Sequence, residues 1–305
     1  MNEIMIKVEN LKKRYGDVLA VDNISFTVRK GEIFGLLGPN GAGKTTTLES
    51  LEGLRCPDSG RLQVAGVDPA HEFRRLRGVI GVQLQSSGLA ENISPAEAMR
   101  FFCSYHGVDP REDLLDRLGL AQKRRSPYGE LSVGQQRRLV LALALAHDPE
   151  VLFLDEPTAG LDVATRAELH AILREQQAQG TTILLATHDM AEAEEMADRI
   201  AILLDGRIAA KGTPMEITAR GAGLTKVSVR TECGSLNELA QMFPAVQKTT
   251  RKEDYLIFFS TDIGPTLSAI IQHVDAHEDK LIDLRVERPS LEDRFLEITK
   301  NGDPR

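Results

Sequence analysis

The stretch that decides the fold is Gly38-Pro-Asn-Gly-Ala-Gly-Lys44-Thr45, which matches the pattern GxxxxGK[ST]. Glycines here let consecutive backbone N–H groups curl around phosphate oxygens, and Lys44 adds a mobile positive charge. An apolar run, IFGLL over residues 33–37, precedes the loop, and KTTTLESLEGL after it spaces its leucines as a helix does. This order predicts a phosphate-binding loop between a strand and a helix whose positive end faces the anion.

Two carboxylates end another predicted strand, Val151–Leu154, which is followed by Asp155 and Glu156. In open α/β sheets, functional groups gather at the carboxyl ends of the strands. A carboxylate there can hold Mg²⁺, usually through water, so we expect Asp155 to bind the metal together with the Thr45 hydroxyl. The next carboxylate can polarise an attacking water, which makes Glu156 the expected general base.

The segment Leu131-Ser-Val-Gly-Gln-Gln136 opens the helix that precedes this strand. Ser132 and Gln135 fit a capping box, with serine as the N-cap and glutamine at position N3. The serine hydroxyl, the Gly134 N–H and the helix N-terminus also form a potential anion site. The pattern therefore predicts a structural role for Ser132 and permits a binding role as well.

Taken together, these segments resemble the ABC ATPases, whose signature reads LSGGQ, over about residues 4–215. The resemblance implies that Gln85 touches Mg²⁺ and senses a membrane partner, and that His188 holds the γ-phosphate. It also implies that Tyr15 stacks on adenine and that Ala159–Asp162 is the D-loop. The nucleotide-binding residues would then be Tyr15, Gly38, Pro39, Asn40, Gly41, Ala42, Gly43, Lys44, Thr45, Thr46, Ser132, Gly134, Gln135 and Asp162.

Several positions leave an alternative open. Tyr15 could instead pack against the N-terminal strands, and His188 could be an ordinary histidine at a strand end. Gln83 lies two residues before Gln85, on the same face of a strand, and Gln85 is preferred by the family pattern. Val133 replaces the middle glycine of the signature; because helix position N1 needs only ordinary helical angles, we expect the site to remain competent.

The resemblance implies an α/β fold of the P-loop NTPase class for residues 1–220. It would have a RecA-like core, an antiparallel β subdomain and an α-helical subdomain over about residues 88–147. After about residue 221 the pattern changes to strand, helix, strand, strand, helix, strand, with a last helix; the predicted elements are Val227–Thr231, Leu236–Phe243, Val246–Thr250, Tyr255–Ser260, Pro265–Ala276, Leu281–Val286 and Leu291–Thr299. This order predicts a small ferredoxin-like α+β domain over residues 221–305.

Composition limits the class of protein. The 305 residues are 42% hydrophobic and 27% charged with a formal net charge of −8, which is ordinary for a globular chain and gives no electrostatic support for nucleic-acid binding. The longest apolar run, Leu139–Ala146, is far shorter than the roughly 20 residues that span a bilayer. The N-terminus shows no signal-peptide pattern. Three widely spaced cysteines predict reduced thiols.

The tail RPSLEDRFLEIT, residues 288–299, resembles the ends of ATPase subunits from multidrug and antibiotic exporters. The resemblance thus implies an ATP-hydrolysing subunit that uses ATP and Mg²⁺ to drive efflux of a drug, antibiotic or other hydrophobic compound. It would bind peripherally to a separate membrane-spanning permease at the cytoplasmic face of the cell membrane and form a homodimer, without a nucleic-acid partner. The alternative is a soluble ABC ATPase in translation, DNA repair or chromosome structure. A P-loop kinase or GTPase would leave LSVGQQ unexplained.

Overall fold

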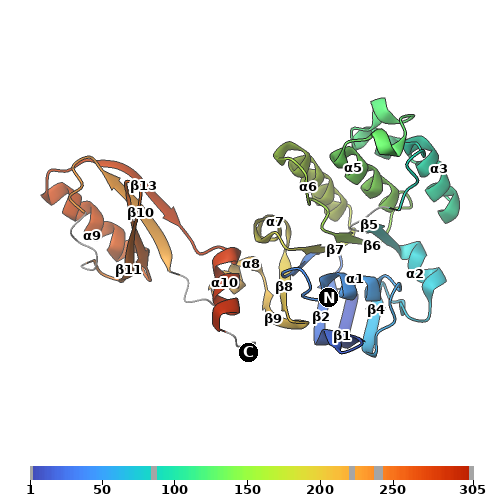
Figure 1. Cartoon of the computed structure of the whole chain (residues 1–305), viewed down its shortest axis with the longest axis horizontal. Coiled ribbons are helices and arrows are strands. Elements are labelled where there is room, and N and C mark those ends of the chain that lie inside the picture. The colour runs from blue at the N-terminus through green and yellow to red at the C-terminus, as the bar shows by residue number, and fades with distance from the viewer. Residues whose placement is uncertain (1–2, 84–87, 220–223, 237–242, 302–305) are drawn as a thin grey trace. The chain divides into compact units, whose positions relative to one another are not determined.

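The structure, a computed structural model, describes residues 3–83, 88–219, 224–236 and 243–301 (Figure 1). Its contacts divide the chain into two compact units, of which the first extends to Pro214 and the second begins at Met215. The sequence pattern places this boundary near residue 220. The difference is helix α8 (Pro214–Ala219), which groups with the second unit.

The first unit is built on a six-stranded sheet of strand order β5-β6-β7-β3-β8-β9. All neighbours are parallel except β8 and β9, which are antiparallel. The strands are β3 (Ile33–Leu37), β5 (Ile80–Gln83), β6 (Val151–Asp155), β7 (Thr182–Thr187), β8 (Arg199–Leu204) and β9 (Arg207–Gly212). Every residue of β3, β6 and β7 is buried, as expected of apolar strands covered on both faces.

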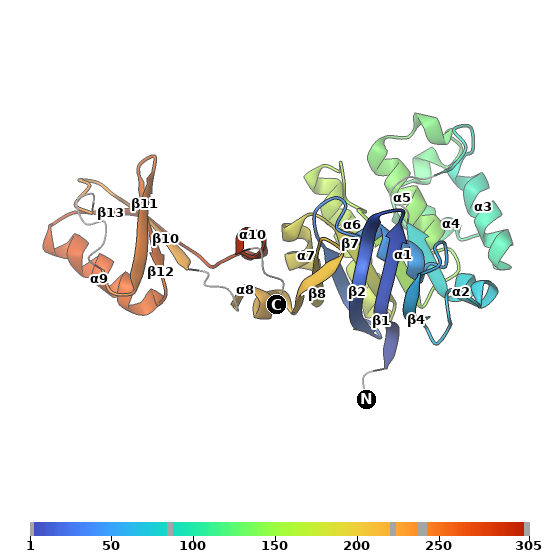
Figure 2. The ribbon, with the colours of Figure 1, turned by 60° about the horizontal axis from the view of Figure 1, so that its bottom comes forward.

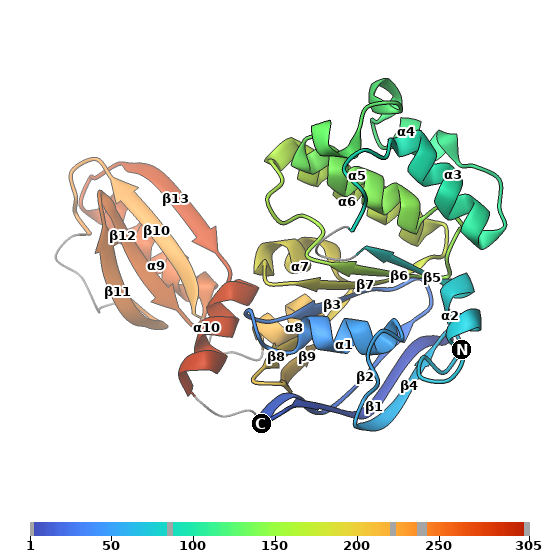
Figure 3. The same cartoon turned by 45° about the vertical axis from the view of Figure 1, so that its right-hand side comes forward.

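Helices cover both faces of this sheet (Figures 1 and 3). Helix α1 (Lys44–Leu51) lies on one face, and α5 (Val133–Ala144), α6 (Val163–Ala178) and α7 (Met190–Met196) lie on the other. The sequence predicts that α5 runs to His147, where Asp148-Pro149 follows, and the helix ends three residues earlier, at Ala144. The sequence predicts a helix over Arg166–Gln179, but α6 begins earlier, at Val163. The Asp162 side chain accepts a hydrogen bond from the Thr165 N–H and caps the helix there.

A second, antiparallel sheet of order β2-β1-β4 packs over α1. Its strands are β1 (Ile4–Tyr15), β2 (Val18–Arg29) and β4 (Ser59–Val64). The apolar alternation in the sequence predicts strands only over Ile4–Val8 and Ile24–Val28. Strands β1 and β2 are longer, because register shifts around Leu11 break that alternation. One hydrophobic core joins this sheet, α1 and the parallel sheet; it includes Val8, Phe26, Leu48, Leu51, Phe153 and Leu184.

Short helices fill most of the region that the sequence predicts as helical. They are α3 (Pro95–His106), α4 (Glu112–Arg117) and the 3₁₀ turns Ala121–Lys123 and Tyr128–Glu130, and α2 (Phe73–Val79) precedes them. Helix α3 has its own capping box, in which Ser94 and Glu97 each accept a hydrogen bond from the other's backbone N–H. Among the described residues, no helix is long and apolar enough to cross a bilayer.

The second unit contains a four-stranded antiparallel sheet of order β11-β12-β10-β13, with α9 packed against it (Figures 1 and 2). Its elements are β10 (Thr225–Thr231), β11 (Val246–Lys252), β12 (Tyr255–Ser260), α9 (Ile263–Ala276), β13 (Leu281–Glu287) and α10 (Leu291–Asn301). Val227, Phe258 and Ile270 lie in its separate core. The predicted helix Leu236–Phe243 falls mostly outside the described residues, so the ferredoxin-like class stays a prediction.

Candidate functional site

The phosphate loop connects the end of β3 to the start of α1, as the sequence predicts. Gly43 is the N-cap of α1 and has a φ of 103°, a left-handed conformation that disfavours any other residue. A Cβ atom there would also lie 2.5 Å from the Ala20 carbonyl oxygen. The loop can therefore close over α1 only with glycine at this position, which leaves backbone N–H groups at the helix N-terminus for an anion.

The Lys44 ammonium group lies inside this loop and is only 6% exposed. It donates hydrogen bonds to the carbonyl oxygens of Gly38, at 2.8 Å, and Pro39, at 3.2 Å. It also lies 3.6 Å from Oε1 of Glu156. A buried positive charge thus stands between the loop and a carboxylate from another strand.

Asp155 ends β6 at the carboxyl edge of the sheet, beside the start of α1. Its Oδ2 accepts a hydrogen bond of 2.9 Å from the Thr45 hydroxyl. Its Oδ1 is buried and has no hydrogen-bond partner among the residues that the structure describes. Burial raises the pKa of the Asp155 carboxyl group, and the neighbouring Glu156 charge raises it further, while the bonded Thr45 hydroxyl and the Lys44 charge oppose this.

Glu156 and His188 follow two adjacent strands, β6 and β7, and meet at the same edge of the sheet. Nδ1 of His188 lies 2.7 Å from Oε2 of Glu156, while the Glu156 N–H donates to the Ala186 carbonyl oxygen at 2.9 Å. Glu156 has a φ of 50°, in the left-handed region that costs a residue with a Cβ on the order of 1 kcal/mol. Its side chain is directed at His188 by a strained backbone.

The signature segment begins α5, and both hydrogen bonds of the predicted capping box are present. Ser132 Oγ accepts from the Gln135 N–H at 3.3 Å, and Gln135 Oε1 accepts from the Ser132 N–H at 3.0 Å. Val133 occupies position N1 and is 57% exposed. A Cβ at Gly134 would meet the Thr165 side chain of α6 at 3.2 Å, so a small residue keeps the two helices close.

The remaining predicted residues lie in different settings. Hydrogen bonds from the Thr165 N–H and hydroxyl lower the pKa of Asp162, which serves as the α6 N-cap. Tyr15 is 39% exposed, with the Lys13 ammonium and the Arg55 guanidinium each 5.6 Å from its ring centroid. Gln85 lies outside the described residues. Gln83, the alternative to it, is buried, and its amide has no hydrogen-bond partner among the described residues.

Sequence reasoning missed Glu52, a buried ionisable residue close to this site. Glu52, directly after α1, is 3% exposed. Burial raises its pKa to about 8, and the charges of Asp155 and Glu49 contribute to the rise. Its place beyond Leu48 and Leu51, on the apolar side of the helix, is the sequence signal that could have identified it.

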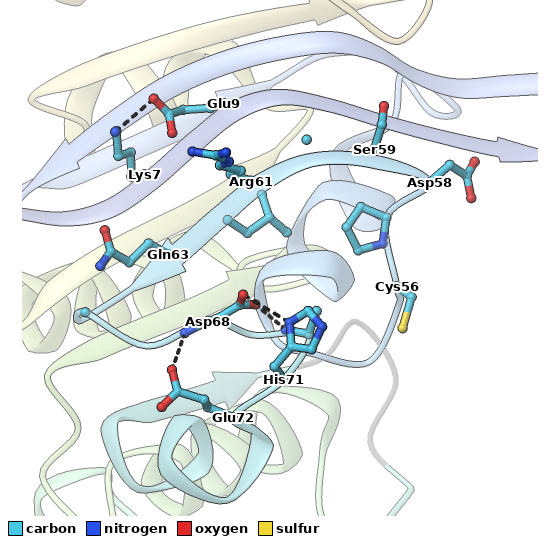
Figure 4. A pocket seen from close by; sticks show the side chains of 15 residues that line it. Lys7, Glu9, Cys56, Asp58, Ser59, Arg61, Gln63, Asp68, His71 and Glu72 are labelled. Atoms are coloured by element: carbon cyan, nitrogen blue, oxygen red, sulfur yellow. Dashed lines mark hydrogen bonds and ion pairs between the residues drawn. The ribbon is translucent and has the colours of Figure 1, made fainter.

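Two hollows open elsewhere on the first unit, and Glu52 lines the second of them. One, of about 700 Å³, opens over β1 and β4, and Figure 4 shows Arg61, Asp68 and His71 among its polar lining residues. The second, of about 440 Å³, is largely apolar and lies between β5, α2, α3 and α5. We call it the α3 groove; its lining includes Leu54, Phe73, Phe102, Tyr105, His106, Leu143 and His147. None of the predicted site residues lines either hollow.

Comparisons with known proteins identify the family of the chain. The family model described as "ABC transporter" matches residues 21–159. The chain is 36% identical to a daunorubicin resistance ATP-binding protein of Streptomyces coeruleorubidus, over 100% of this chain and 98% of that protein. It is 38% identical to a Nod factor export ATP-binding protein I of Ralstonia nicotianae, over 97% and 94% of the two chains.

Among solved structures, it resembles a bacterial ABC transporter cassette in a dimeric structure, with a TM-score of 0.63 and 27% identity over 68% of this chain and 98% of that one. The phosphate loop, the paired strand-end carboxylates and the full-length similarity lead to one conclusion. The chain belongs to the ATP-binding subunits of ABC transporters, a family that binds ATP, hydrolyses it to power transport and works with separate membrane permease subunits.

Proposed function

We propose that this chain is the ATPase subunit of an exporter and drives efflux of a drug, antibiotic or other hydrophobic compound through a separate permease. The observation that carries the proposal is the convergence of Lys44, Thr45–Asp155 and Glu156–His188 at one edge of the sheet. Relatives named for daunorubicin resistance and Nod factor export support the direction and the substrate class. The chain would work peripherally, at the cytoplasmic face of the membrane.

Lys44 and the loop backbone would hold the phosphates, and Thr45, Asp155 and Gln85 would hold Mg²⁺. The hydroxyl and carboxylate oxygens of Thr45 and Asp155 are hard ligands of the kind that Mg²⁺ prefers, and the buried, unpartnered Oδ1 of Asp155 fits a cation. When bound, Mg²⁺ neutralises charge that develops on the phosphates.

Glu156 would accept the proton of the water that attacks the terminal phosphate. Its hydrogen bond with His188 fixes the carboxylate, and Lys44 adds a positive charge beside it. His188 would also contact the terminal phosphate, since its side chain is 56% exposed. The part-exposed Tyr15 ring would stack on adenine.

A second copy of the chain would complete each site with Ser132, Gly134, Gln135 and Asp162. The support is that Ser132 and Val133 are exposed at the start of α5, and that a similar cassette has a dimeric structure. The Ser132 hydroxyl and the α5 N-terminus then offer an anion site to the partner's nucleotide. Residues 1–220 would carry hydrolysis, and residues 221–305 would form an accessory domain.

The α3 groove would receive a segment of the permease. It is apolar, and exposed aromatic side chains stand nearby: Phe101 is 65% exposed and Tyr105 is 51% exposed. A contiguous exposed apolar surface of this kind often marks a site of interaction with another protein. A movement of the permease segment would be transmitted to the nucleotide site through β5, because β5 pairs with β6, the strand that ends in Asp155.

Two substitutions test the ATPase assignment in the purified chain. We expect Lys44→Ala to lose ATP binding or hydrolysis with the fold intact, and Glu156→Gln to keep ATP binding while turnover falls by about a hundredfold or more. Glu150→Gln, at the opposite end of β6 and exposed, is the matched control and should behave as wild type. Normal turnover in Glu156→Gln would place the base elsewhere.

A further inference from the structure

A buried polar contact joins the loop of the proposed base to the helix that follows His188. Thr158 is two residues beyond Glu156, and its hydroxyl donates a 2.7 Å hydrogen bond to Oε1 of Glu192 in α7. Thr158 is 3% exposed and Glu192 is 2% exposed. The two residues are 34 positions apart in the chain, so this contact is tertiary rather than local.

Glu192 is also held on its other sides. Its N–H donates to Oδ1 of Asp189, the N-cap of α7, at 3.1 Å, and Asp189 directly follows His188. His170 of α6 places Nε2 3.4 Å from Glu192 Oε1 and is itself 5% exposed. Glu192 is therefore fixed with respect to His188 through the first turn of α7 and with respect to the sheet through α6.

The buried carboxyl group of Glu192 does not stabilise the fold by itself. Its Oε2 is buried and finds no hydrogen-bond partner among the described residues. A buried carboxylate that lacks full hydrogen bonding destabilises a fold relative to a well-packed apolar side chain. The contact with Thr158 thus needs a reason other than stability.

The backbone at Glu156 supplies that reason. Its φ of 50° is a strained conformation for a residue with a Cβ, and such conformations persist only where the surroundings hold them. The Glu156 N–H, which precedes the strained φ torsion, donates a hydrogen bond to the Ala186 carbonyl oxygen on β7. The Thr158–Glu192 hydrogen bond ties the chain just after it. The two anchors together fix the backbone on both sides of the base.

We propose that Glu192, acting through Thr158, is a positioning residue that holds Glu156 and His188 in register with each other. Glu156, at one end of the hydrogen bond with His188, lies two residues before Thr158. His188, at the other end, precedes Asp189, which is the N-cap of α7, the helix that carries Glu192. Neither Thr158 nor Glu192 belongs to the residues that we place on the nucleotide. The inference rests on the proposed role of Glu156 as the base.

The test compares substitutions that remove the hydrogen bond with substitutions that keep it. Thr158→Val keeps the shape and removes the hydroxyl, so kcat should fall between about tenfold and a hundredfold, the usual effect of a misplaced catalytic group. The KM for ATP should change by less than about twofold, because binding is left intact. Thr158→Ser, which restores a hydroxyl, should recover most of the lost kcat. Glu192→Gln, which keeps an acceptor oxygen, should lose less than Glu192→Ala.

Controls separate positioning from general damage to the fold. Glu194→Gln makes the same chemical change on an exposed residue of α7 and should leave kcat unchanged. Turnover is counted per bound nucleotide, so partial unfolding lowers the number of sites without changing kcat. If Thr158→Val does not fold, the comparison of Glu192→Gln with Glu192→Ala carries the test in the same way.

The outcome also separates this inference from the proposed function. In a Glu156→Gln background, Thr158→Val should have no further effect on kcat, because a base that is absent needs no positioning. If Glu156→Gln is inactive while Thr158→Val keeps wild-type kcat, or if serine gives no recovery, the positioning role is wrong and the base assignment stands. If Glu156→Gln turns over normally, the base assignment itself fails.

Discussion

Glu52 is a carboxylic acid buried at the C-terminal end of α1, and its pKa makes stability depend on pH. Burial raises the pKa of Glu52 in the folded chain to about 8, from an ordinary value of 4.5. Between these values the unfolded chain holds fewer protons than the folded chain, so the free energy of unfolding falls as pH rises. We expect Glu52→Gln to be as stable as wild type near the lower end of this range and more stable, by up to a few kcal/mol, above its upper end. Urea unfolding of the nucleotide-free protein in a chelator measures both curves, and parallel curves would contradict the assignment.

Residue positions that follow from a motif could be predicted from the sequence. Lys44, Thr45, Asp155, Glu156 and His188 do converge at one edge of the sheet, because strand ends and a loop fix where each side chain starts. Positions that follow from tertiary contacts could not. Glu192 stands in the segment MAEAEEM beside two other glutamates, Glu194 and Glu195, and only the fold makes it the buried one.

Two helices offer a matched pair of capping boxes on the scale of single elements. Ser94 caps α3 and Ser132 caps α5, each with a glutamate or glutamine at position N3. Replacing either serine by alanine should lower the free energy of unfolding by about 1 kcal/mol, the usual value of an N-cap. Because Ser132 also belongs to the proposed composite site, we expect Ser132→Ala to lose ATPase activity severalfold, while Ser94→Ala keeps it. Equal activity in the two variants would leave Ser132 with a structural role alone.

Elements with a strong periodic pattern were predictable, and short ones were not. The buried strands β3, β6 and β7 follow from apolar runs. The β8–β9 hairpin follows from Asp205-Gly206, a strong two-residue turn signal between Ile200–Leu204 and Arg207–Ala210. Strand β4 buries only Leu62 and Val64, and its pairing with β1 is what makes it a strand. Helix α8 lies just where the sequence pattern changes between the two units, so the pattern places the boundary near residue 220, whereas the contacts divide the chain at Met215.

The whole molecule is expected to act as a symmetric pair, and a mixing experiment tests this. Lys44→Ala damages a chain's own phosphate loop but spares the signature that it offers to its partner. Ser132→Arg spares the loop and blocks the signature by bulk and charge. Each homodimer should be inactive, because both of its sites carry one lesion. In a heterodimer, one site carries both lesions and the other carries none.

When the two variants are mixed in equal amounts before dimerisation, half of the dimers are heterodimers. Each heterodimer has one intact site out of two. If the sites act independently, ATPase activity should recover to about a quarter of the wild-type value, as mass action requires for an isologous pair. A fully active mixture is excluded by this count, so a larger recovery would mean that the variants exchange unequally. If no activity is recovered, either the two sites must act together or each site lies within one chain, and a titration of wild-type protein concentration separates these causes. Sites that must act together need the dimer, so the activity per chain then rises with protein concentration. A site contained within one chain gives the same activity per chain at every concentration, and that result would overturn the composite site.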